Sequence, residues 1–452
     1  MIDLFDFQLT DVNKLESQSA VLIGNEMGTG KTYEAIERDL RIRSKVQGPT
    51  LVIAPLTPLE STWLEHYNEL TNLTCVLIDP KNRAKSWEEF TGPWHPDVFL
   101  VHWDALRLMP EIARHSWAHI IADEVHRAKD RKSQQTRALK AIQNTIYKTG
   151  MSGTPVVNRP DELWSTLNWL YPKKYGSYWK FCGKYVEYEI IYAKGRTFKK
   201  VKGPQNEDQL LKEIEPFYVR HLKKNVLKDL PPKYYTRIKV DLTAQQRRVY
   251  NTMRDDMIAW IGSQEDDILP APVVIAQLIR LQQFAVAYAE LSEGRVKLSE
   301  PSSKLDAVME IIDETDQQVV VFSQFKQAIS LLGDRLSGKS VPYVALTGDT
   351  PQAGRAELVA RFQRGDARVF AGTIGAGGVG ITLHAASTVI FIDRHWSPAL
   401  NIQAEDRLHR IGQKNAVQVI DISAKNTVDA NRAVTLATKA EWIRRILGDN
   451  PS

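Results

Sequence analysis

The sequence predicts an α/β fold in which two parallel-sheet lobes follow one another along the chain. Short apolar, β-branched runs alternate with helical patterns, and this alternation is typical of parallel sheets covered by helices on both faces. The runs fall into two blocks, which indicates two separate sheets. The chain of 452 residues is also too long for one ordinary hydrophobic core and suits two or three domains.

Each block holds six strand-like runs. Those of the first block cover residues 20–24, 50–55, 75–78, 98–102, 119–124 and 148–155. Those of the second block cover residues 237–242, 317–324, 341–348, 367–372, 388–393 and 417–423. Pro231 and Pro232 lie between the blocks and are typical of a hinge. We therefore predict lobe one at residues 1–232 and lobe two at residues 233–452.

Two stretches depart from the alternation and predict small insertions on the lobes. Residues 172–215 are rich in Tyr, Trp and Lys, and the pattern predicts a hairpin that turns at Lys194 and Gly195. Residues 243–300 are predicted to be helical. The basic and aromatic side chains of the first insertion could contact the phosphates and bases of DNA, and the alternative is a solvated lysine face.

The composition excludes several classes of protein. Hydrophobic residues make up 43% and charged residues 25% of the chain, which is typical of a soluble globular protein. The 59 basic and 54 acidic residues leave a net charge of +5, so contacts with a polyanion must come from local patches. Cys75 and Cys182 form no disulfide framework and have no metal-ligand spacing. The N-terminus lacks a signal-peptide pattern, and polar residues interrupt the most apolar stretch, residues 273–291, so no membrane span is expected.

A glycine loop between a predicted strand and a predicted helix indicates a phosphate site. The stretch VLIGNEMGTGKT covers residues 21–32. Backbone N–H groups freed by Gly28 and Gly30, together with the amino end of the helix, form a cradle for phosphate oxygens. Lys31 is expected to pair with the β- and γ-phosphates of ATP, and the Thr32 hydroxyl is expected to bind Mg²⁺. The predicted nucleotide-binding residues of the loop are Met27, Gly28, Thr29, Gly30, Lys31 and Thr32.

An acidic pair at the end of another strand would complete such a site. In HIIADEVHRAKD, Asp123 and Glu124 directly follow an apolar run. Taken alone, such a pair is more often the charged start of a helix. Together with the glycine loop, the pair predicts that Asp123 holds Mg²⁺ through water and that Glu124 orients and deprotonates the attacking water.

Two further features are ambiguous when only the residues are considered. Gln8, in FDFQLTDV, could read the adenine edge through its amide or be an ordinary surface glutamine. Arg407 and Arg410, in QAEDRLHRIGQ, lie three residues apart among good helix formers, so both guanidinium groups are predicted on one helical face. A guanidinium is suited to gripping a phosphate or a carboxylate, but a solvated surface helix is the commoner outcome for such a pair.

Six segments of the chain occur in the order of the superfamily 2 helicase motifs. They are GNEMGTGKT, DEVHRAKD, MSGTPVVNRPDELW, VVVFSQF, GAGGVGITL and QAEDRLHRIGQ. In these forms the chain resembles the SWI/SNF-type DNA translocases over roughly residues 5–435. FYVRHLKKNVLKDLPPK is similar to the linker between the lobes in that family, and HRIGQ is specific to the family rather than to helicases in general. The resemblance implies two RecA-like lobes in tandem with a cleft between them, and ATP and Mg²⁺ as cofactors.

The resemblance also implies roles for single residues. Gln8 becomes the expected adenine contact, and Arg407 and Arg410 become arginine fingers that lobe two presents to the γ-phosphate held on lobe one. Residues expected to couple the state of ATP to the grip on nucleic acid are Ser152, Gly153, Thr154 and Gln403, with Asp406 on the same helix surface. Residues expected to contact the tracked DNA strand are Thr57, Pro58, Trp103, Ser323, Gln324 and Gly377, with Gly378 nearby.

The sequence departs from the family pattern at three places. The glycine loop has Asn25 where the full pattern has glycine, with Gly24 one place early. Gly375 stands where many relatives have Thr or Arg, so the side-chain contact with DNA that those residues imply is not expected at this step. Val125 replaces the commoner alanine of the acidic motif, a change expected to be harmless. The tyrosine-rich insertion and QAEDR resemble the fork-remodelling, strand-annealing branch of the family.

The function that the resemblance implies is a DNA-dependent ATPase that couples hydrolysis to translocation on double-stranded DNA. The expected partners are double-stranded or forked DNA and a protein that directs loading. The chain is expected to be a near-minimal, monomeric motor with no accessory domain after the last motif. It is expected in the cytoplasm on nucleoid DNA, or in the nucleus of a eukaryote. Two alternatives remain open, a DExH-type RNA helicase and a nucleotide-switched DNA-binding module with little turnover.

Overall fold

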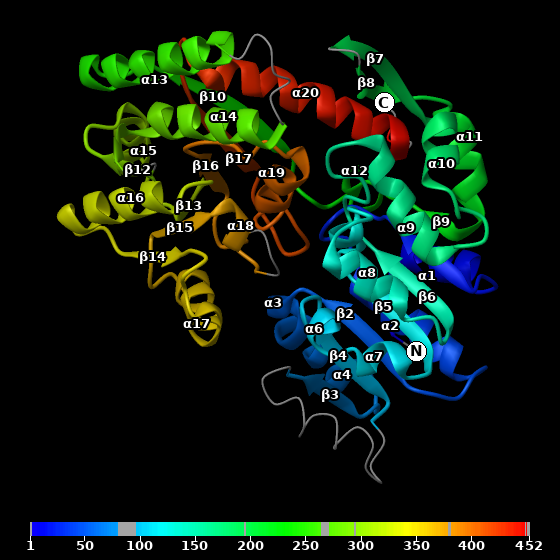
Figure 1. Ribbon diagram of the computed structural model, residues 1–452. Helices are drawn as coiled ribbons and strands as arrows, with labels where there is room; N and C mark the ends of the chain where they lie inside the picture. The colour runs from blue at the N-terminus through cyan, green and yellow to red at the C-terminus, as the bar shows by residue number, and fades with distance from the viewer. Residues whose placement is uncertain are drawn as a thin grey trace. The chain divides into compact units, whose positions relative to one another are not determined.

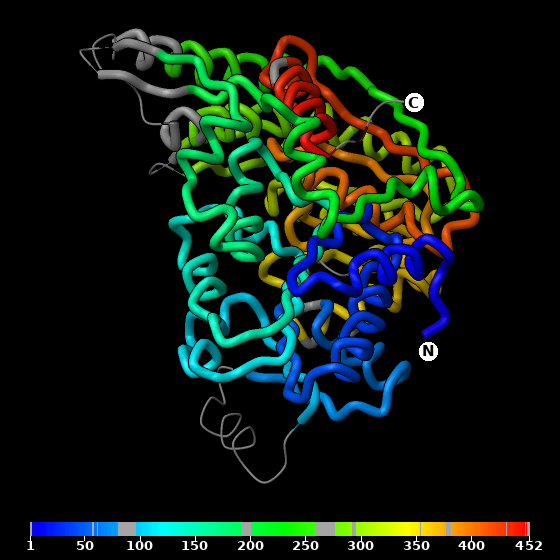
Figure 2. The backbone as a smooth tube through the Cα atoms, turned by 90° about the vertical axis from the view of Figure 1, so that its right-hand side faces the viewer, coloured from blue at the N-terminus to red at the C-terminus, as the bar shows by residue number. Residues whose placement is uncertain are grey.

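The computed structural model describes residues 2–79, 96–193, 196–263, 271–292, 295–377, 381–447 and 449. The remaining residues are grey in Figures 1 and 2. The chain divides into two compact units: unit 1 comprises residues 1–191, 197–229 and 439–452, and unit 2 comprises residues 192–196 and 230–438. The division at Asp229 and Leu230 lies close to the predicted boundary at residue 232. The residues from Lys439 onward group with unit 1, whereas the sequence prediction assigns them to lobe two.

Unit 1 contains a seven-stranded parallel sheet in the order β3-β4-β2-β5-β6-β1-β9 (Figure 1). The strands are β1 (Ala20–Ile23), β2 (Thr50–Ala54), β3 (Cys75–Ile78), β4 (Val98–His102), β5 (Trp117–Ala122), β6 (Thr145–Met151) and β9 (Tyr218–Val219). The first six overlap the predicted runs, although β5 and β6 begin two and three residues earlier than predicted. β9 was not predicted because two residues carry no periodic pattern, yet it pairs with Leu22 and Ile23 at the sheet edge.

The sheet of unit 1 is buried on both faces. Every residue of β1, β2 and β5 is buried, which explains why these strands read as continuous apolar runs. Side chains alternate between two hydrophobic clusters, because successive residues of a strand point to opposite faces. Ala20 and Leu22 enter one cluster, whereas Val21 and Ile23 enter the other.

Helices cover the sheet of unit 1 and carry its insertion. The α-helices are α1 (Asp6–Leu15), α2 (Lys31–Arg43), α3 (Leu56–Pro58), α4 (Glu65–Leu70), α6 (Ala105–Leu108), α7 (Glu111–Arg114), α8 (Gln134–Ala141), α9 (Leu163–Leu170), α10 (Tyr178–Tyr185), α11 (Glu207–Ile214) and α12 (Lys223–Val226). A π-helical turn covers Leu59–Leu64, and 3₁₀ turns cover Val125–Ala128, Pro160–Glu162 and Glu215–Phe217.

The aromatic insertion is anchored in the core of unit 1. β7 (Val186–Ala193) and β8 (Arg196–Pro204) form a separate two-stranded sheet, as predicted, and the predicted turn at Lys194 and Gly195 lies outside the described residues. Phe181 and Tyr185 of α10 are buried in the main hydrophobic cluster, whereas Trp179 of the same helix is 62% exposed. The insertion is therefore a packed part of the unit that leaves one large aromatic side chain on its surface.

Unit 2 contains a six-stranded parallel sheet in the order β10-β17-β16-β13-β15-β14. The strands are β10 (Lys233–Val240), β13 (Val319–Ser323), β14 (Tyr343–Leu346), β15 (Val369–Thr373), β16 (Thr388–Phe391) and β17 (Val417–Ala424). Its helices are α13 (Ala244–Ser263), α14 (Ala271–Val286), α15 (Ser303–Asp313), α16 (Lys326–Gly338), α17 (Gln352–Gln363), α18 (Ile374–Gly377) and α19 (Pro398–Glu405). A last helix, α20 (Val428–Leu447), begins in unit 2, and its final turns belong to unit 1. Both parallel sheets confirm the predicted fold class.

The prediction of a helical insertion at residues 243–300 is wrong at its end. α13 and α14 are helical, but β11 (Tyr288–Ser292) and β12 (Arg295–Ser299) form an antiparallel pair. Burial alternates along these strands, since Ala289 and Leu298 are buried while Glu290 is exposed. Among the described residues, none of the helices is both long and apolar enough to cross a membrane.

Candidate active site

Segments far apart in the sequence meet at one edge of the sheet in unit 1. Gly24 follows β1, Asp123 follows β5 and Ser152 follows β6, and these three strands are neighbours. Because parallel strands all end at the same edge, the three segments lie side by side there. Ligands of open parallel sheets bind at this carboxyl edge. The structure therefore brings together the glycine loop, the acidic pair and the predicted coupling segment.

The glycine loop has the backbone conformation of a phosphate cradle. Gly28 and Gly30 have φ angles of 75° and 83°, a left-handed conformation that other residues rarely adopt. α2 begins directly after Gly30, so the N–H groups of its first turn border the loop. A Cβ atom on Gly30 would lie 2.6 Å from Nε2 of Gln8, so any other residue there would also displace the Gln8 amide.

The ammonium group of Lys31 is held inside the loop. Its Nζ donates hydrogen bonds to the backbone carbonyl oxygens of Asn25 (2.9 Å) and Glu26 (3.0 Å). Burial lowers the pKa of Lys31, while the charges of Glu124 and Asp123 act to raise it. A phosphate in the loop would give this cation a charged partner, so the residues fit a bound nucleotide.

Two tryptophans hold the acidic pair in place. Nε1 of Trp63 donates to Oδ2 of Asp123 (3.1 Å), and Nε1 of Trp103 donates to the Asp123 carbonyl oxygen (2.9 Å). The Glu124 N–H donates to Oδ1 of Asp123 at 2.8 Å. Burial, and then the nearby Glu124 carboxylate, raise the pKa of Asp123 to about 6. A buried carboxylate beside a second carboxylate fits the oxygen-rich surroundings of Mg²⁺, whose charge would stabilise the ionised form of Asp123.

His126 connects the acidic pair to the coupling segment. Its Nδ1 lies 2.8 Å from Oγ of Ser152 and 3.2 Å from Oε2 of Glu124. Oγ of Ser152 also accepts a hydrogen bond from the Thr154 N–H at 3.1 Å. Glu124 has a φ angle of 50°, a conformation that is uncommon outside glycine and concentrated at functional sites. Sequence reasoning missed His126, although the residue stands in the quoted DEVH motif.

The coupling segment also packs directly on the glycine loop. A Cβ atom on Gly153 would lie 2.4 Å from Cγ of Met27, so only glycine permits this approach. Thr154 is buried next to it, at 6% exposure. Contact and hydrogen bonding thus join the predicted phosphate and coupling residues into one cluster.

Asn25 has a structural function that the glycine of the usual pattern could not provide. Its side chain is fully buried, and Nδ2 donates to Oδ2 of Asp11 (2.8 Å) and Oε1 of Glu34 (3.0 Å). Oδ1 of Asn25 accepts a hydrogen bond from the His221 N–H at 2.8 Å. Burial, and then the Asp11 charge, raise the pKa of Glu34 to about 8. Asn25 therefore separates two buried acids and ties the loop to the chain after β9.

Gln8 lies against the glycine loop and is buried. Its Nε2 donates to the carbonyl oxygens of Thr29 (2.9 Å) and Gly30 (3.2 Å), and its Oε1 accepts from the Phe5 N–H (3.0 Å). The amide therefore supports the shape of the loop. Its contact with adenine stays a prediction.

Of the predicted DNA-contact residues of unit 1, two lie at the carboxyl edge of the sheet and the third is buried in the core. Thr57 and Pro58 lie in α3, directly after β2 at the same sheet edge, and the Thr57 side chain lies outside the described residues. Trp103 is only 1% exposed and belongs to the hydrophobic core. In this structure its ring is not available to a DNA strand, because it is packed behind Asp123.

The predicted DNA-contact residues of unit 2 cluster at the carboxyl edge of its own sheet. Ser323 ends β13 and is fully buried, and its hydroxyl donates to Oδ2 of Asp393 at 2.5 Å. The Gln324 N–H donates to Oδ1 of Asp393 at 3.0 Å. Burial raises the pKa of Asp393. Gly377 ends α18, and Gly378 lies outside the described residues.

The prediction that Arg407 and Arg410 share a helical face is wrong. α19 ends at Glu405, and both arginines lie in the turn that follows. The Leu383 N–H donates to the Arg407 carbonyl oxygen at 2.8 Å. In a continuing α-helix, that carbonyl oxygen would instead accept from an N–H of the next turn. Tertiary hydrogen bonding therefore overrides the helix propensity of this stretch.

The side chains of both arginines form hydrogen bonds with the segment that contains Ile381 and Thr382. Nη1 of Arg410 donates to Oγ1 of Thr382 at 2.7 Å, and Nη1 of Arg407 donates to the Ile381 carbonyl oxygen at 3.5 Å. Gln403 is buried in α19, so it lies on the helix whereas the arginines do not. Asp406 follows the helix, and its Oδ1 lies 3.4 Å from Nζ of Lys233.

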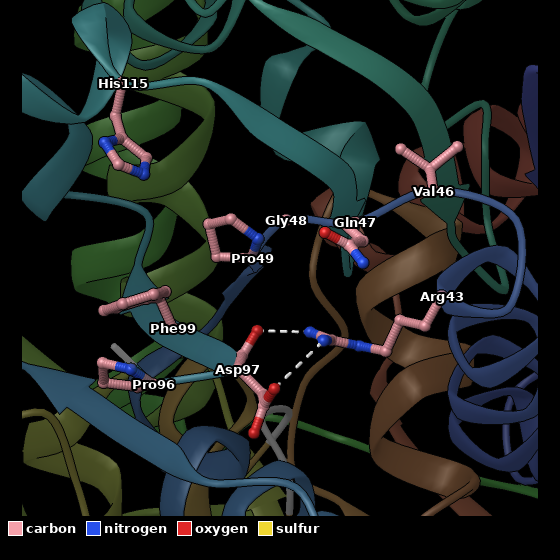
Figure 3. A pocket seen from close by; sticks show the side chains of 9 residues that line it. All are labelled: Arg43, Val46, Gln47, Gly48, Pro49, Pro96, Asp97, Phe99 and His115. Atoms are coloured by element: carbon pink, nitrogen blue, oxygen red, sulfur yellow. Dashed lines mark hydrogen bonds and ion pairs between the residues drawn. The ribbon is translucent and has the colours of Figure 1, made fainter. Parts of the chain in front are cut away.

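A cavity of about 430 Å³ opens at the opposite edge of the sheet in unit 1 (Figure 3). Pro49 precedes β2 and Asp97 precedes β4, so the cavity lies at the amino ends of the strands. Arg43 reaches Asp97 there, with 3.4 Å between Nη1 and Oδ1. The cavity is therefore remote from the glycine loop and has no part in the candidate site.

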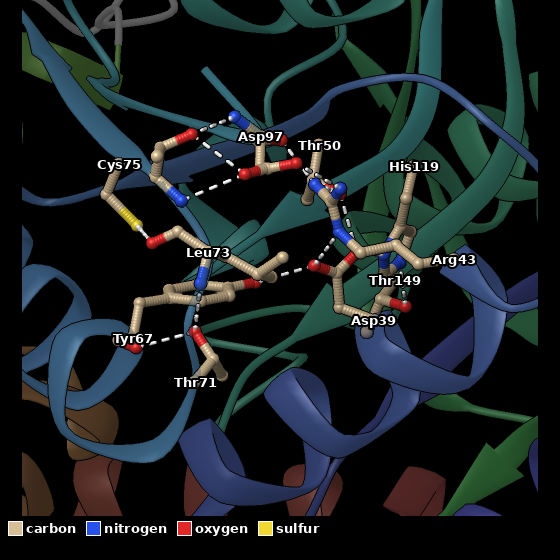
Figure 4. Close-up of polar contacts among 11 residues, drawn as sticks. Asp39, Arg43, Thr50, Tyr67, Thr71, Leu73, Cys75, Asp97, His119 and Thr149 are labelled. Carbon is tan, nitrogen blue, oxygen red and sulfur yellow. Dashed lines mark hydrogen bonds and ion pairs between the residues drawn. The ribbon is translucent and has the colours of Figure 1, made fainter.

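A buried polar network adjoins this cavity through Arg43 (Figure 4). Nδ1 of His119 lies 2.8 Å from Oδ1 of Asp39, and its Nε2 lies 2.8 Å from Oγ1 of Thr149. The Tyr67 hydroxyl donates to Oδ2 of Asp39 at 3.1 Å. The network satisfies polar groups in the core and thereby stabilises the fold rather than the chemistry.

Comparison with known proteins agrees with this geometry. The family described as "SNF2-related domain" matches residues 10–286, and the one described as "Helicase conserved C-terminal domain" matches residues 303–412. Nuclear protein STH1/NPS1 of Saccharomyces cerevisiae is 29% identical over 437 residues, which cover 90% of this chain and 32% of that protein. ATP-dependent helicase brm of Drosophila melanogaster is 29% identical over 442 residues, with 90% and 27% covered.

A bacterial relative and a solved structure are also similar to this chain. An uncharacterized ATP-dependent helicase of Mycoplasma pneumoniae is 28% identical over 442 residues, with 96% of this chain and 40% of that protein covered. The chain thus spans between about a quarter and two-fifths of the length of these curated relatives. The Sulfolobus solfataricus SWI2/SNF2 ATPase core in complex with dsDNA is 23% identical, with 98% of this chain and 97% of that chain covered and a TM-score of 0.45. Because the first family match alone covers more than half of the sequence, the chain belongs to the SNF2-related family, as its motifs predicted.

Proposed function

We propose that this chain is a DNA-dependent ATPase that couples ATP hydrolysis to translocation on double-stranded DNA. The observation that carries the proposal is the contact of His126 with both Glu124 and Ser152, beside the glycine loop. A link of this kind lets a change at the γ-phosphate alter the segment expected to control the grip on DNA. Membership of the SNF2-related family and relatives named as ATP-dependent helicases support the same function.

The nucleotide site has a residue for each requirement of phosphoryl transfer. The backbone from Met27 to Thr32 would bind the phosphates, and Lys31 would pair with their charge. The Thr32 hydroxyl and Asp123 would hold Mg²⁺, which neutralises charge on the phosphates when bound. Glu124 would orient the attacking water and accept its proton.

Unit 2 would complete the reaction through its arginines. Arg407 and Arg410 would stabilise the charge that develops on the γ-phosphate, a contribution of ~10³–10⁵ in rate for an arginine finger. Because these groups belong to the other unit, hydrolysis would depend on the arrangement of the two units, and each cycle could be converted into a step along DNA.

The DNA strand would be held by the carboxyl edges of both sheets. Thr57, Pro58, Gln324 and Gly377 are the proposed contacts. Ser323 and Trp103 are buried, so we propose that they act by positioning their neighbours. In the aromatic insertion, Lys200 and Lys202 are exposed and could add phosphate contacts, whereas the Lys199 side chain lies outside the described residues.

The test is ATP hydrolysis with no polymer, duplex DNA, single-stranded DNA, forked DNA and RNA. Each condition is repeated with Lys31→Ala and with Arg407→Ala. We expect strong stimulation by duplex or forked DNA and its loss in both variants. Lys31→Ala should also abolish nucleotide binding, whereas Arg407→Ala should preserve it, because only Lys31 belongs to the loop.

Other outcomes would assign other functions. Stimulation by RNA alone would move the chain to the DExH-type RNA helicases. ATP binding with slow turnover under all conditions would indicate a nucleotide-switched binding module. Strong hydrolysis that Arg407→Ala leaves unchanged would remove the arginine-finger role but keep the ATPase.

A further inference from the structure

Arg220 connects the glycine loop with the coupling segment. It directly follows β9, the strand beside β1, and thus lies at the edge of the sheet that carries the candidate active site. Its Nη1 donates to the carbonyl oxygen of Gly24 at 2.5 Å and to that of Gly153 at 2.9 Å. One guanidinium nitrogen therefore fixes the start of the phosphate cradle and the centre of the coupling segment.

The other side of the same guanidinium is held by Asp449. Nε of Arg220 lies 3.0 Å from Oδ1 of Asp449, and Nη2 lies 2.7 Å from Oδ2. Both side chains are largely buried, with 12% and 10% of their surfaces exposed. Such a two-pronged pair fixes the plane of the guanidinium as well as its charge. The direction in which Nη1 points is therefore set by Asp449.

Asp449 is carried to this place by the last turns of α20, which dock on unit 1. Ile443, Ile446 and Leu447 are buried in the main hydrophobic cluster of that unit. Arg445 forms an ion pair with Glu207 and donates to the carbonyl oxygen at position 204. These contacts anchor the helix without touching the glycine loop.

We propose that Asp449 is a positioning residue for the nucleotide site, acting through Arg220 on the carbonyl groups of Gly24 and Gly153. The chain segment at the end of α20 thereby supplies the carboxylate that orients Arg220 toward the phosphate cradle. The inference rests on the proposed function, because it takes the glycine loop to be the site of ATP. It adds to that function a control element that is more than 400 residues away from the loop in sequence.

When Asp449 loses its charge, the Arg220 guanidinium loses its carboxylate partner. A buried cation that loses its carboxylate is strongly destabilised and turns toward water or other acceptors. The two carbonyl groups then lose a charge-assisted hydrogen bond, and the loop gains freedom. ATP binding should weaken, because the cradle must be ordered again when the nucleotide arrives.

The test compares Asp449→Asn with Asp449→Glu and with Arg445→Ala in the full chain. Asp449→Asn keeps the size and removes the charge, and Asp449→Glu keeps the charge. Arg445→Ala is the matched control, because it loosens the same helix without contacting Arg220. Four quantities are measured: hydrogen exchange of the amides at residues 25–32 without nucleotide, KM for ATP and kcat with duplex DNA, and the thermal midpoint.

We expect Asp449→Asn to speed exchange in the loop and to raise KM about tenfold with a smaller change in kcat, as for loss of one charged hydrogen bond. Asp449→Glu should recover most of both effects. Arg445→Ala should lower the thermal midpoint while leaving loop exchange and KM unchanged. Should Asp449→Asn fail to fold, Arg220→Lys takes its place, because one ammonium cannot reach both carbonyls and the carboxylate.

Two results would overturn the inference. One is unchanged loop exchange and KM in Asp449→Asn, and the other is an equal effect of Arg445→Ala on the loop, which would reduce Asp449 to a docking contact. Absence of ATP binding by the unaltered chain would instead defeat the proposed function. The exchange measurement, made without nucleotide, would still decide whether Asp449 orders the loop.

Discussion

Nδ1 of His126 lies 2.8 Å from the hydroxyl oxygen of Ser152. This contact spans two neighbouring strands, since His126 follows β5 and Ser152 follows β6. The same imidazole lies 3.2 Å from Oε2 of Glu124, the proposed base, and the Ser152 hydroxyl oxygen also accepts a hydrogen bond from the Thr154 N–H. The pair is therefore a direct polar path between the proposed hydrolysis chemistry and the coupling segment in unit 1.

Removing the imidazole should uncouple DNA stimulation from ATP binding. In His126→Phe the ring remains but the hydrogen bond is lost, at a net cost of about 1 kcal/mol. We expect the DNA-stimulated kcat to fall about fivefold, while KM for ATP stays close to that of the unaltered chain. Steady-state hydrolysis with and without duplex DNA measures both quantities.

A double-mutant cycle tests whether the contact itself is responsible. Ser152→Ala removes the partner, so the double variant His126→Phe/Ser152→Ala should be no slower than either single variant. Additive losses in kcat would mean that the two residues act separately, and the proposed path would have to be abandoned.

The second prediction concerns Trp103, which could either position Asp123 or contact DNA directly. Its substitution should affect kcat in the first case and DNA affinity in the second. Its indole donates to the Asp123 carbonyl oxygen from a fully buried position. Trp103→Phe should therefore lower kcat several-fold by loosening the acidic pair, as expected for one lost hydrogen bond. Binding of duplex DNA without nucleotide should be unchanged. A titration of labelled duplex would decide, and a large loss of DNA affinity would restore the direct-contact role.

The segments whose placement at one sheet edge agrees with the sequence prediction are defined by local sequence. The glycine loop consists of consecutive residues. A phosphate cradle requires a strand, then glycines such as Gly28 and Gly30, and then a helix, so the pattern is visible in a short stretch of sequence. The acidic pair is likewise fixed by the strand before it. Asp123 and Glu124 could therefore be placed beside the loop with no knowledge of the packing around them.

The parts that could not be predicted depend on contacts between distant segments. Arg407 and Arg410 lie outside a helix because Leu383 takes the carbonyl group that the helix would need. β9 has two residues and becomes a strand only because β1 offers it an edge. Arg220 follows β9, so its position next to the glycine loop could not be predicted from hydrophobic periodicity either.

Asn25 provides a third prediction, in which the usual glycine is the worse residue. Asn25→Gly removes the amide that donates to Asp11 and Glu34 and accepts from the His221 N–H. Leaving buried polar groups without partners should lower the free energy of unfolding by about 2–3 kcal/mol. Chemical denaturation of the purified chain at pH 7 measures the loss.

Above pH 8, where the Glu34 carboxyl group is ionised, the same substitution should be partly rescued by replacing this carboxylate with a neutral amide. Glu34→Gln keeps an acceptor but removes a carboxyl group whose pKa is raised to about 8 by burial. The double variant Asn25→Gly/Glu34→Gln should therefore be more stable than Asn25→Gly alone, which a double-mutant cycle would reveal as a coupling energy. Strict additivity would show that Asn25 does not act on Glu34.

The buried pair of His119 and Asp39 gives a prediction about pH. Burial lowers the pKa of His119. Burial raises the pKa of Asp39, but the hydrogen bond and charge of His119 outweigh it, so the net pKa of Asp39 is lowered. Both groups therefore bind protons more readily in the unfolded chain than in the folded one. The stability that they contribute is present at neutral pH and is lost as the pH falls, first through His119 below its ordinary pKa of about 6.5.

His119→Gln isolates the part of this dependence that belongs to the imidazole. Between pH 6 and pH 5, the free energy of unfolding of the unaltered chain should fall more steeply than that of the variant, by up to about 1.4 kcal/mol per pH unit. Denaturant titrations at several pH values measure the slope. His115→Gln, at the rim of the neighbouring cavity, is the control, because its imidazole packs edge-on against the Trp117 ring. Equal slopes for His119→Gln and the unaltered chain would mean that His119 takes up its proton inside the fold, and that the network in Figure 4 tolerates a charged imidazole.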